Sequence, residues 1–571
     1  MSNKELIHIL NELSGLLLLK GENEFKARAY SNAADIIITN KLDVIQITKD
    51  GELNTIKGFG DALQSKISDY VSNGKMAYYE NLKAEIPEGL IDISKISGLG
   101  PKKARSLYYD SNIISISDLM EICENGKLAD IKGFGEKSAK AILEGIYRIK
   151  NAKGKFLQHI AYTDAEDFLK FIKPLESIEK AAVSGELIRW QEEITYILVV
   201  LTIKKDKSIS ELLDFLKLKY EIKQTVDYIE FINENGLKFK ILVCESQDFT
   251  WLYHKHSCNL EYFNAFTEFA SYQGFEIKNE GIFKNSVKII SDTEEKLYNN
   301  LSLQFVPVEI REEPQSLQFA NTGQIPELIQ ASDMKGMLHC HSTWSDGKHS
   351  LRDMALATKE LGFSYFAICD HSRSAFYANG LSIDRVLQQH EEINRLNQEN
   401  LGIKILKGIE SDILPDGSLD YPDDILAKFD IIVASVHNGF KMSKQEMTDR
   451  IIKAVSNPYT TILGHPTGRL ILSRPGYELD IEAVIDSAKT FNKVIEINAS
   501  PRRLDLNWKY AQLAKMKGVK LAINPDAHNT ENLKQYIFGI NQARKAWLTK
   551  NDVINTLSLY EFEKQIINKF K

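Results

Sequence analysis

Seven short apolar segments in the last third of the chain constrain its fold more than any other feature. They are GMLHCH (336–341), YFAICDH (365–371), IKILKGIE (403–410), IIVASVH (431–437), TTILGH (460–465), KVIEIN (493–498) and KLAINPDAH (520–528). Amphipathic stretches with helical spacing, such as LRDMALATKELG and IEAVIDSAKT, separate most of them. Alternating strands and helices predict a parallel sheet, and seven repeats favour a barrel over an open sheet.

Most of these predicted strands end in a histidine or an acid. In a barrel of this kind the carboxyl ends of the strands meet at one mouth, where active sites are built. His339 and His341 are two residues apart on one strand, so both imidazoles are expected on the same side. Nine side chains are predicted to meet at the mouth: His339, His341, Asp346, His371, Glu410, His437, His465, Asp526 and His528.

Nine nitrogen and oxygen donors are too many for one ion and predict a site for two or three divalent ions. A mixture of imidazole and carboxylate favours Mn²⁺, Zn²⁺ or Fe over Ca²⁺. Any single histidine could instead be a hydrogen-bonded core residue, but their repeated occurrence at strand ends indicates ligands. His349 and His390 do not follow this pattern and are expected on the surface.

The N-terminal region contains one pattern three times, in LNTIKGFGDALQSKI (53–67), ISKISGLGPKKARSL (93–107) and LADIKGFGEKSAKAI (128–142). Each copy predicts a helix-hairpin-helix, in which two glycines permit a tight turn and backbone amides at a helix N-terminus can hold a phosphate oxygen. Such contacts grip the backbone of DNA without reading its sequence. The alternative is three glycine-capped turns without a ligand. The residues predicted to bind DNA are Gly58, Gly60, Gly98, Gly100, Lys102, Lys103, Gly133, Gly135 and Lys137.

Length and composition limit the remaining possibilities. A chain of 571 residues is expected to form two to four domains. The net charge of −7 argues against a general nucleic-acid coat, so phosphate contacts must be local. Five cysteines without paired spacing predict thiols in the cytoplasm. No apolar run is long enough to span a bilayer, and we therefore expect no membrane partner.

Residues 1–150 resemble the N-terminal part of bacterial family X DNA polymerases. KARAYSNAA (26–34) is similar to that family's helix with a lysine and a tyrosine. The resemblance implies that Lys66, in the helix after the first hairpin, forms a Schiff base with an abasic sugar. This chemistry needs an amine whose pKa is lowered by burial or by neighbouring positive charge. A lysine on a helix surface is the alternative.

The resemblance continues over residues 155–310 and implies an α+β, nucleotidyltransferase-like palm and thumb. In SGELIRWQEEITYILVVLT (184–202) the family has a Gly-Ser hairpin and two magnesium-binding aspartates one residue apart. We align these aspartates with Thr195 and Ile197 and the hairpin serine with Glu186.

The remaining catalytic positions of the palm are also altered. We align the third aspartate of the family with Lys240, and LYHK (252–255) replaces its nucleotide-gripping Phe-Thr-Gly-Ser. Since neither Thr nor Ile can hold magnesium, the palm is predicted to be inactive in polymerisation. His254 and His256 form a second H-x-H, expected in a solvated loop. The proline-rich stretch that follows predicts a linker over 311–332.

Residues 333–571 resemble the PHP (polymerase and histidinol phosphatase) superfamily, in LDYPDDIL (419–426), EINASPRRLDLN (496–507) and PDAHN (525–529). The resemblance implies a distorted seven-stranded barrel whose trinuclear metal cluster hydrolyses phosphoesters. Met337 stands where the family usually has an acid, so a residue that orients a histidine is expected to be missing. The cluster chemistry is assigned to Glu410, as a bridge between ions, with Asp346 and His371, and phosphate binding is assigned to Arg469, Arg502 and Arg503.

The sequence therefore predicts a multidomain, metal-dependent DNA phosphoesterase, and a 3′-to-5′ exonuclease of DNA repair best fits the combination of domains. We expect it to bind gapped, nicked or 3′-ended duplex as a monomer. Three alternatives remain. They are an active family X DNA polymerase, a small-molecule phosphatase like histidinol-phosphate phosphatase, and a non-catalytic DNA-binding scaffold.

Overall fold

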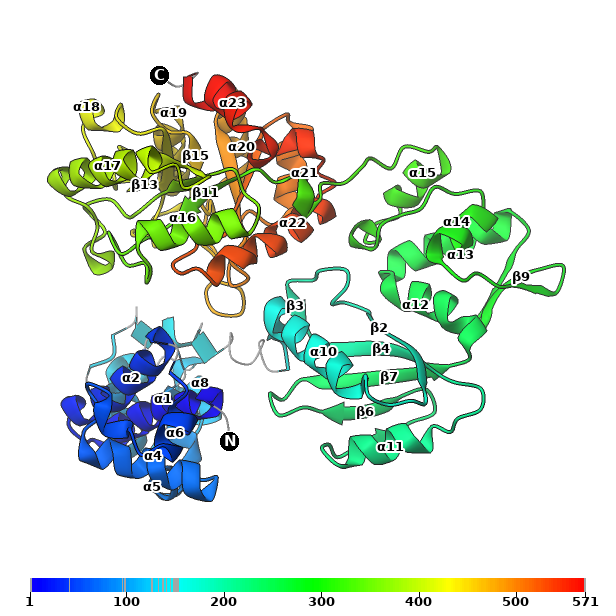
Figure 1. The fold of residues 1–571 in the computed structure, drawn as a ribbon, viewed down its shortest axis with the longest axis horizontal. Helices are drawn as coiled ribbons and strands as arrows, with labels where there is room; N and C mark the ends of the chain where they lie inside the picture. Colours follow the sequence, from blue (N-terminus) through cyan, green and yellow to red (C-terminus); the bar gives the residue numbers. More distant parts are fainter. Residues whose placement is uncertain are drawn as a thin grey trace. The chain divides into compact units, whose positions relative to one another are not determined.

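The computed structural model describes residues 3–40, 42–94, 96, 99–124, 127–131, 133–135, 138–139, 141–143, 145–146 and 154–568. The chain forms two compact units, Met1–Lys153 and Gly154–Lys571, whose elements are labelled in Figure 1. In the described ranges, no helix combines the length and the apolar character needed to cross a bilayer. Gly98 and Lys137 lie outside the described residues.

The first unit is helical. Its elements are α1 (Asn3–Lys20), α2 (Glu24–Thr39), α3 (Val44–Lys49), η1 (Leu53–Thr55), α4 (Asp61–Asn73), α5 (Ala77–Glu85), α6 (Glu88–Ser94), α7 (Pro101–Asp110), α8 (Ile116–Glu124) and η2 (Lys127–Asp130). Between its two glycines each hairpin carries an apolar residue, and Phe59, Leu99 and Phe134 are each 4% exposed in the shared core. These three apolar side chains anchor the hairpins in the core of the helical unit.

The second unit begins with a mixed sheet that confirms the expected α+β region. Its strand order is β2–β4–β7–β6–β5. These strands are β2 (Ile178–Ser184), β4 (Tyr196–Ile203), β7 (Lys238–Cys244), β6 (Ile229–Ile232) and β5 (Lys223–Gln224). Strands β4 and β7 are parallel, and the other pairs are antiparallel. A two-stranded pair of β1 (Phe156–Leu157) and β3 (Glu193–Ile194), with helices α10 (Gln158–Ile172) and α11 (Ser210–Lys217), completes this part.

A second group of elements follows the mixed sheet. It contains η3 (Ser246–Asp248), α12 (Phe249–Ser257), α13 (Leu260–Tyr272), the sheet β8 (Glu276–Lys278), β9 (Gly281–Lys284) and β10 (Val287–Ile289), α14 (Glu294–Asn300), η4 (Val308–Ile310) and α15 (Gln315–Asn321). The segment predicted as a linker therefore contains regular structure. Arg311 is fully buried, and its Nη1 donates to Glu294 Oε1 at 2.5 Å and to Ser257 Oγ at 2.7 Å. The prolines at 307 and 314 flank this buried turn, so 311–332 is not simply an exposed connection.

The last part of the chain is the predicted parallel barrel. Its strands follow one another in sequence order, β11 (Gly336–Cys340), β12 (Tyr365–Ile368), β13 (Lys404–Asp412), β14 (Ile431–Ser435), β15 (Ile462–Leu463), β16 (Val494–Asn498) and β17 (Leu521–Asn524). Cys340 and Ala527 form a parallel bridge between the first and last strands, and the amide of His341 donates to the Ala527 carbonyl at 2.8 Å. The distorted (β/α)₇ barrel expected from the seven apolar segments is confirmed.

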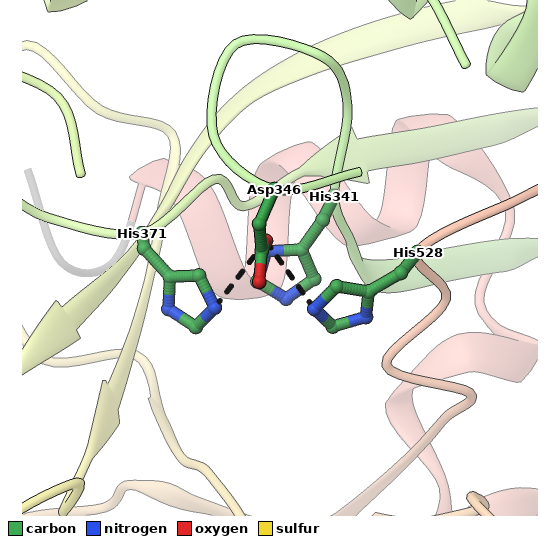
Figure 2. A group of neighbouring side chains, drawn as sticks. All are labelled: His341, Asp346, His371 and His528. Carbon is green, nitrogen blue, oxygen red and sulfur yellow. Dashed lines mark ion pairs between the residues drawn. The ribbon is translucent and has the colours of Figure 1, made fainter. Parts of the chain in front are cut away.

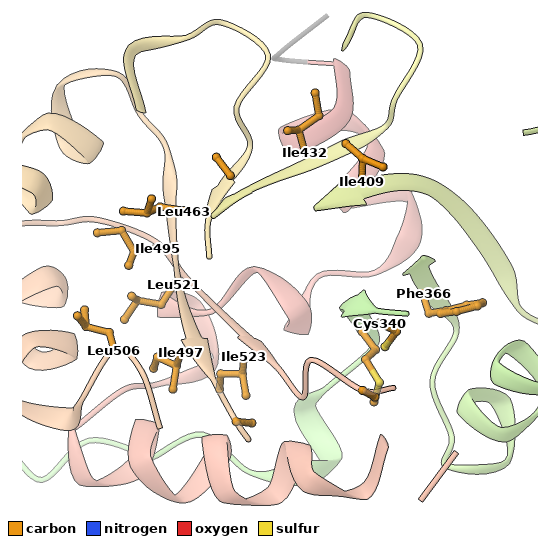
Figure 3. Packing of buried hydrophobic residues seen from close by; sticks show 14 of the residues in the cluster. Cys340, Phe366, Ile409, Ile432, Leu463, Ile495, Ile497, Leu506, Leu521 and Ile523 are labelled. Carbon is orange, nitrogen blue, oxygen red and sulfur yellow. The ribbon is translucent and has the colours of Figure 1, made fainter. Parts of the chain in front are cut away.

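Helices surround the barrel strands. They are η5 (Ala331–Asp333), α16 (Leu351–Glu360), η6 (Phe376–Ala378), α17 (Ile383–Gln398), α18 (Asp423–Leu426), α19 (Lys444–Ser456), α20 (Ile481–Thr490), α21 (Trp508–Met516), η7 (Asn532–Gln535), α22 (Tyr536–Lys545), η8 (Lys550–Asp552), η9 (Ile554–Thr556), α23 (Leu559–Phe562) and η10 (Glu563–Ile567). Figure 3 shows apolar side chains of the strands, among them Phe366, Ile409 and Ile495, packed in the layer between strands and helices. This apolar layer fixes the strands in place, and the polar side chains lie at the carboxyl ends of the strands.

Contacts also join the barrel to the mixed sheet. Lys545 of α22 is buried, donates to the Arg189 carbonyl at 2.9 Å and forms an ion pair with Glu312. Arg469 Nη1 donates to Glu192 Oε2 at 2.9 Å and its Nη2 donates to Glu192 Oε1 at 2.6 Å. Two charged pairs thus connect the barrel to the part of the chain before it.

Candidate metal centre at the barrel mouth

The structure brings all nine predicted donors to the mouth of the barrel, with Glu410 at their centre. Glu410 Oε1 lies 2.9 Å from His465 Nε2, 3.3 Å from His437 Nε2 and 3.5 Å from His339 Nε2. Glu410 Oε2 lies 2.9 Å from His371 Nδ1 and 3.6 Å from His341 Nε2. Five imidazoles from four strand ends therefore face one buried carboxylate.

The donor atoms fall into three overlapping groups, each compact enough for one cation. Their members are His341, Asp346, His371 and His528 in the first, His339, His341 and Asp526 in the second, and His371, Glu410 and His437 in the third. In the first group Asp346 Oδ1 lies 3.4 Å from His528 Nε2 and 3.7 Å from His371 Nε2, as Figure 2 shows. Because the groups share histidines, neighbouring ions would be held as one cluster.

A local irregularity of β11 helps to place its two histidines. The pairing of β11 with β12 changes register between Met337 and Cys340. A bulge of this kind re-aims side chains at the end of a strand. Leu338 consequently joins the inner apolar cluster, while its neighbour His339 still reaches the mouth beside His341.

Unpartnered polar atoms test whether this donor set fits cations. Five buried atoms of the cluster have no hydrogen-bond partner. They are His339 Nε2, His341 Nδ1, His371 Nδ1, His465 Nδ1 and Glu410 Oε2. Buried polar atoms without partners are costly, and a group of them signals an ion or another ligand. Imidazole nitrogens and carboxylates are the donors that Mn²⁺, Zn²⁺ and Fe prefer. The residues therefore fit a divalent metal cluster.

Two carboxylates that sequence reasoning missed orient the histidines. Glu496 Oε1 lies 2.8 Å from His339 Nδ1, and Asp412 Oδ1 lies 2.5 Å from His437 Nδ1. A partner on the second ring nitrogen fixes the tautomer and the direction of a metal-binding imidazole. The sequence signal for these two acids was their position: Glu496 lies within the strand segment KVIEIN, and Asp412 lies two residues after the segment IKILKGIE. Met337, where an orienting acid was expected, is buried in the apolar layer, and His339 is oriented by Glu496 instead.

The electrostatics of the cluster reflect its crowded carboxylates. Burial by itself would lower the pKa of His437, but Glu410 and Asp412 raise it to about 10. Burial opposes protonation of His528 in the same way, and Asp346 with Asp526 raises its pKa to about 9. The carboxylates thus attract positive charge to this mouth, which protons or metal ions can supply.

Replacing Asp412 by asparagine is expected to weaken binding of the first Mn²⁺ equivalents roughly 10- to 100-fold, because His437 loses the charged partner of its Nδ1. Isothermal titration of the chelator-treated full-length protein with Mn²⁺ measures the change. Asp416→Asn, in an exposed loop beyond the same strand, is the matched control and should leave the affinity unchanged. Equal affinities of the Asp412→Asn variant and the parent protein would show that Asp412 does not orient a ligand.

The three arginines predicted to bind phosphate lie in different surroundings. Arg503 Nε lies 3.8 Å from Asp526 Oδ2, at the edge of the cluster. Arg469 is held by Glu192 and also donates to the Leu504 carbonyl, so both of its terminal nitrogens already have acceptors. Arg502 is exposed. Arg503 is therefore the one of the three whose position fits a phosphate beside the cluster.

The described hairpin glycines of the first unit lie next to helix N-termini or in turns. Gly60 and Gly100 precede α4 and α7 as N-caps without a side-chain cap, which leaves amides of the first turn available. Gly58 and Gly133 have φ of 100° and 94°, a conformation that favours glycine. The Gly135 carbonyl accepts hydrogen bonds from the amides of Ser138 and Ala139.

The basic residues beyond the hairpins differ in their contacts. The Lys102 side chain is 89% exposed and forms a 3.1 Å ion pair with Glu24, while Lys103 Nζ lies 5.4 Å from the Phe134 ring centre. Lys66 Nζ lies 4.6 Å from the Tyr78 ring centre and donates to the Ala62 carbonyl. Burial, and then the charge of Lys26, lower the pKa of Lys66, which favours the neutral amine that Schiff-base chemistry needs.

The palm register corrects the predicted positions of the lost aspartates. Leu198 pairs with Lys240, and Ile197 pairs with Phe239. Paired residues of neighbouring strands point to the same face, so Lys240 shares its face with Tyr196 and Leu198, whereas Ile197 is buried in the core on the other face. The alignment with Thr195 and Ile197 was wrong by one residue. The corrected positions, Tyr196 and Leu198, also lack carboxylates.

Thr195 and Glu186 form a contact of their own in front of this sheet. The backbone amide and the hydroxyl of Thr195 donate to Glu186 Oε2 at 3.1 and 3.0 Å. Lys240 lies 4.4 Å from the Tyr196 ring centre and 3.9 Å from Glu230. A cation and an aromatic ring occupy the face on which magnesium would require acids.

Two histidine predictions outside the cluster were wrong. The second H-x-H lies in α12 rather than in a solvated loop, and His254 is fully buried with Nδ1 3.0 Å from Glu294 Oε1. His390, expected on the surface, is buried in α17 against Phe429, with ring centres 5.0 Å apart. His349 is half-buried, and its Nδ1 accepts from the Thr530 amide. All three serve packing and hydrogen bonding outside the cluster.

The domain comparisons agree with this geometry. Residues 337–500 match the PHP domain, residues 1–76 match a helix-hairpin-helix domain, and residues 90–146 match a SAM-like helix-hairpin-helix tandem. A probable phosphatase of Thermoanaerobacter sp. (strain X514) is 33% identical over 217 residues, which cover 34% of this chain and 86% of the phosphatase. A PHP domain is metal-dependent, so the barrel mouth belongs to a class of metal-binding domain.

A full-length relative identifies the family. The DNA polymerase/3′-5′ exonuclease PolX of Bacillus subtilis (strain 168) is 35% identical over 571 residues, which cover 99% of both chains. This chain belongs to the PolX family, the family X DNA polymerases that carry a C-terminal PHP domain.

Proposed function

We propose that this protein is a metal-dependent DNA phosphoesterase that shortens DNA from the 3′ end in DNA repair. The observation that carries the proposal is the convergence of nine donors at one barrel mouth, all but Asp346 buried or half-buried and several without a hydrogen-bond partner. The exonuclease activity named for the B. subtilis relative supports the direction of cutting. The hairpins of the first unit supply contacts to the DNA backbone that a small-molecule phosphatase does not need.

The residues at the mouth have three proposed roles in phosphoester hydrolysis: metal binding, orientation of the histidines and phosphate binding. Divalent ions, when bound, polarise the phosphate and make hydroxide available near neutral pH. Glu410 would hold two of the ions, with Asp346 and His371 completing their ligands. Glu496 and Asp412 keep His339 and His437 in their binding orientations. Arg503, at the edge of the cluster, would hold a non-bridging phosphate oxygen of the DNA.

The partners and cofactors follow from the same residues. Three donor groups support two or three ions, with Mn²⁺ or Zn²⁺ preferred and Fe as a further candidate. We propose a monomer that binds gapped, nicked or 3′-ended duplex through Gly58, Gly60, Gly100, Gly133 and Gly135. The protein would act in the cytoplasm, where its five cysteines stay as thiols. Lys66 is the proposed nucleophile of an additional abasic-sugar lyase activity.

The palm is proposed to position DNA without polymerising it. Tyr196, Leu198 and Lys240 offer no oxygen donor of the kind that magnesium prefers. The loss of a metal site removes several kcal/mol of charge stabilisation, which corresponds to many powers of ten in rate.

Incubation of the full-length protein with a 5′-labelled primer-template, Mn²⁺ and dNTPs tests the proposed function. We expect a ladder of shortened primers and no extension. Extended primers would refute the inactive palm, whereas an unchanged primer would refute the exonuclease. The double variant His339→Ala/His341→Ala is the control and should abolish shortening while DNA binding in a gel-shift assay persists. Release of phosphate from small monoesters at a comparable rate would favour the phosphatase alternative.

A further inference from the structure

The loop that follows β12 presents two aromatic side chains at the rim of the metal centre. Phe376 is 89% exposed and Tyr377 is 72% exposed, and both belong to η6. The Tyr377 ring centre lies 6.2 Å from that of His371 and 6.4 Å from that of His437. An exposed aromatic ring therefore lies directly beside two of the proposed metal ligands.

The backbone of this loop starts and ends at His371. Ser372 and Leu381 form a parallel bridge, and the Leu381 amide donates to the His371 carbonyl at 2.9 Å. The amide of Gly380 donates to the Ala375 carbonyl at 3.1 Å. The loop that carries Tyr377 is thus hydrogen-bonded to His371, whose ring lies beside that of Tyr377.

Local sterics leave the turn little freedom. A Cβ on Gly380 would lie 1.9 Å from the Ser372 carbonyl oxygen, so only glycine fits there. Asn379 has a φ of 55°, in the left-handed region, and its carbonyl accepts from Arg385 Nη1 at 2.8 Å. Exposed rings occur elsewhere on the chain, but Tyr377 combines exposure with a constrained backbone and a position beside two of the proposed metal ligands.

The loop is also connected to the opposite side of the cluster. Ser374 Oγ donates to Asp412 Oδ2 at 2.8 Å, and the other oxygen of Asp412 faces His437. The carboxylate that orients one ligand therefore also positions the loop. Tyr377 is held in a defined place relative to His371 and His437, which allows it to select what enters the mouth.

We propose that Tyr377 stacks on the base of the 3′-terminal nucleotide while its phosphate occupies the metal centre, with Phe376 contacting the next base outward. The proposal rests on the exonuclease function and adds the substrate feature that the site recognises. Every nucleobase presents a flat π face, so stacking on an aromatic ring holds DNA ends of any sequence. A terminal base can reach the ring only if it is unpaired, and the new element of the proposal is therefore the residue that holds such a base.

Kinetics with two oligonucleotides test the stacking. Single-stranded DNA with an ordinary 3′-terminal nucleotide is compared with DNA that ends in an abasic analogue. Tyr377→Ala should lower kcat/KM about tenfold on the ordinary end, mainly through KM, and should have little effect on the abasic end. Tyr377→Phe should retain activity, because the ring is kept. Equal losses in the Phe and Ala variants, or equal losses on both substrates, would refute stacking.

Tyr560 offers a matched control. It is also 72% exposed, but it lies in α23, whose Phe562 packs on Tyr365 at the first residue of β12, at the other end of the barrel. Tyr560→Ala should therefore leave both substrates unaffected. If the parent protein shortens DNA and Tyr377→Ala shortens it equally well, this inference fails while the exonuclease function stands. If the parent protein shortens neither substrate, the proposed function itself fails.

A binding measurement without metal separates contact from chemistry. A 2-aminopurine at the 3′ end loses fluorescence when it stacks, so mixing this DNA with chelator-treated protein should quench the signal. Tyr377→Ala should reduce the quenching and Tyr560→Ala should not. Quenching that is identical in all three proteins would overturn the assignment of Tyr377.

Discussion

Changing Glu410 to glutamine is expected to reduce the rate of DNA shortening by roughly three orders of magnitude or more. Glu410 lies within 3.6 Å of five imidazoles, so neighbouring ions would share its charge. Glutamine keeps the shape but removes the charge that offsets two cations, and metals contribute several kcal/mol to such reactions. The rate is measured on a 5′-labelled oligonucleotide at saturating Mn²⁺.

Glu391→Gln provides the matched control, because that residue is exposed on α17 and outside the cluster. It should retain the activity of the parent protein. The metal content of the Glu410→Gln variant, measured by elemental analysis, should fall together with the rate. Activity within tenfold of the parent would contradict the placement of the catalytic cluster at the barrel mouth.

Changing Arg311 to alanine is expected to destabilise the region of α12 to α15 by about 3–5 kcal/mol. Arg311 is fully buried and donates to Glu294, Ser257 and the Val306 carbonyl. Burial would raise the pKa of Glu294, but the Arg311 guanidinium holds it at about 2. Removal of the guanidinium leaves a charged carboxylate without its main partner inside the protein. Urea unfolding followed by circular dichroism measures the loss.

An exposed ion pair in the same region supplies the comparison. Lys296 and Asp292 lie 2.7 Å apart, and their side chains are 63% and 64% exposed. Lys296→Ala should change the free energy of unfolding by less than about 1 kcal/mol, because solvent screens such pairs. If both variants unfold at the same urea concentration, the buried network around Arg311 does not stabilise this region.

The barrel and its metal centre could be predicted because each strand is a short apolar run in the sequence and most of these runs end in a histidine or an acid. His339, Glu410 and His465 each end an apolar run, and parallel strands bring their carboxyl ends together. The orienting roles of Glu496 and Asp412 could not be assigned, since an acid on a buried strand has many possible partners. Glu496 lies on a predicted strand segment and Asp412 lies two residues beyond one, but only the three-dimensional contacts show that they pair with His339 and His437.

The central region was harder to predict for two physical reasons. A shift of one residue in a strand exchanges its two faces, so the alignment at Ile197 failed although the absence of acids was correctly seen. The prolines suggested an open connection around Arg311, whereas Arg311 is buried by partners that the local sequence does not reveal, Glu294 and Ser257, which lie 17 and 54 residues away. His254 was misplaced for the same reason, because its burial depends on these long-range contacts.

The ion pairs that join the barrel to the part of the chain before it have a consequence for truncation of the protein. A nuclease obtained by truncation near residue 333 would lose Glu312 and Glu192, leaving the buried Lys545 and the half-buried Arg469 without counter-charges. Isolated buried charge is more costly than the pair that it came from. The region before the barrel is therefore a structural support, and a barrel expressed without it is expected to be less stable than the same barrel in the whole chain.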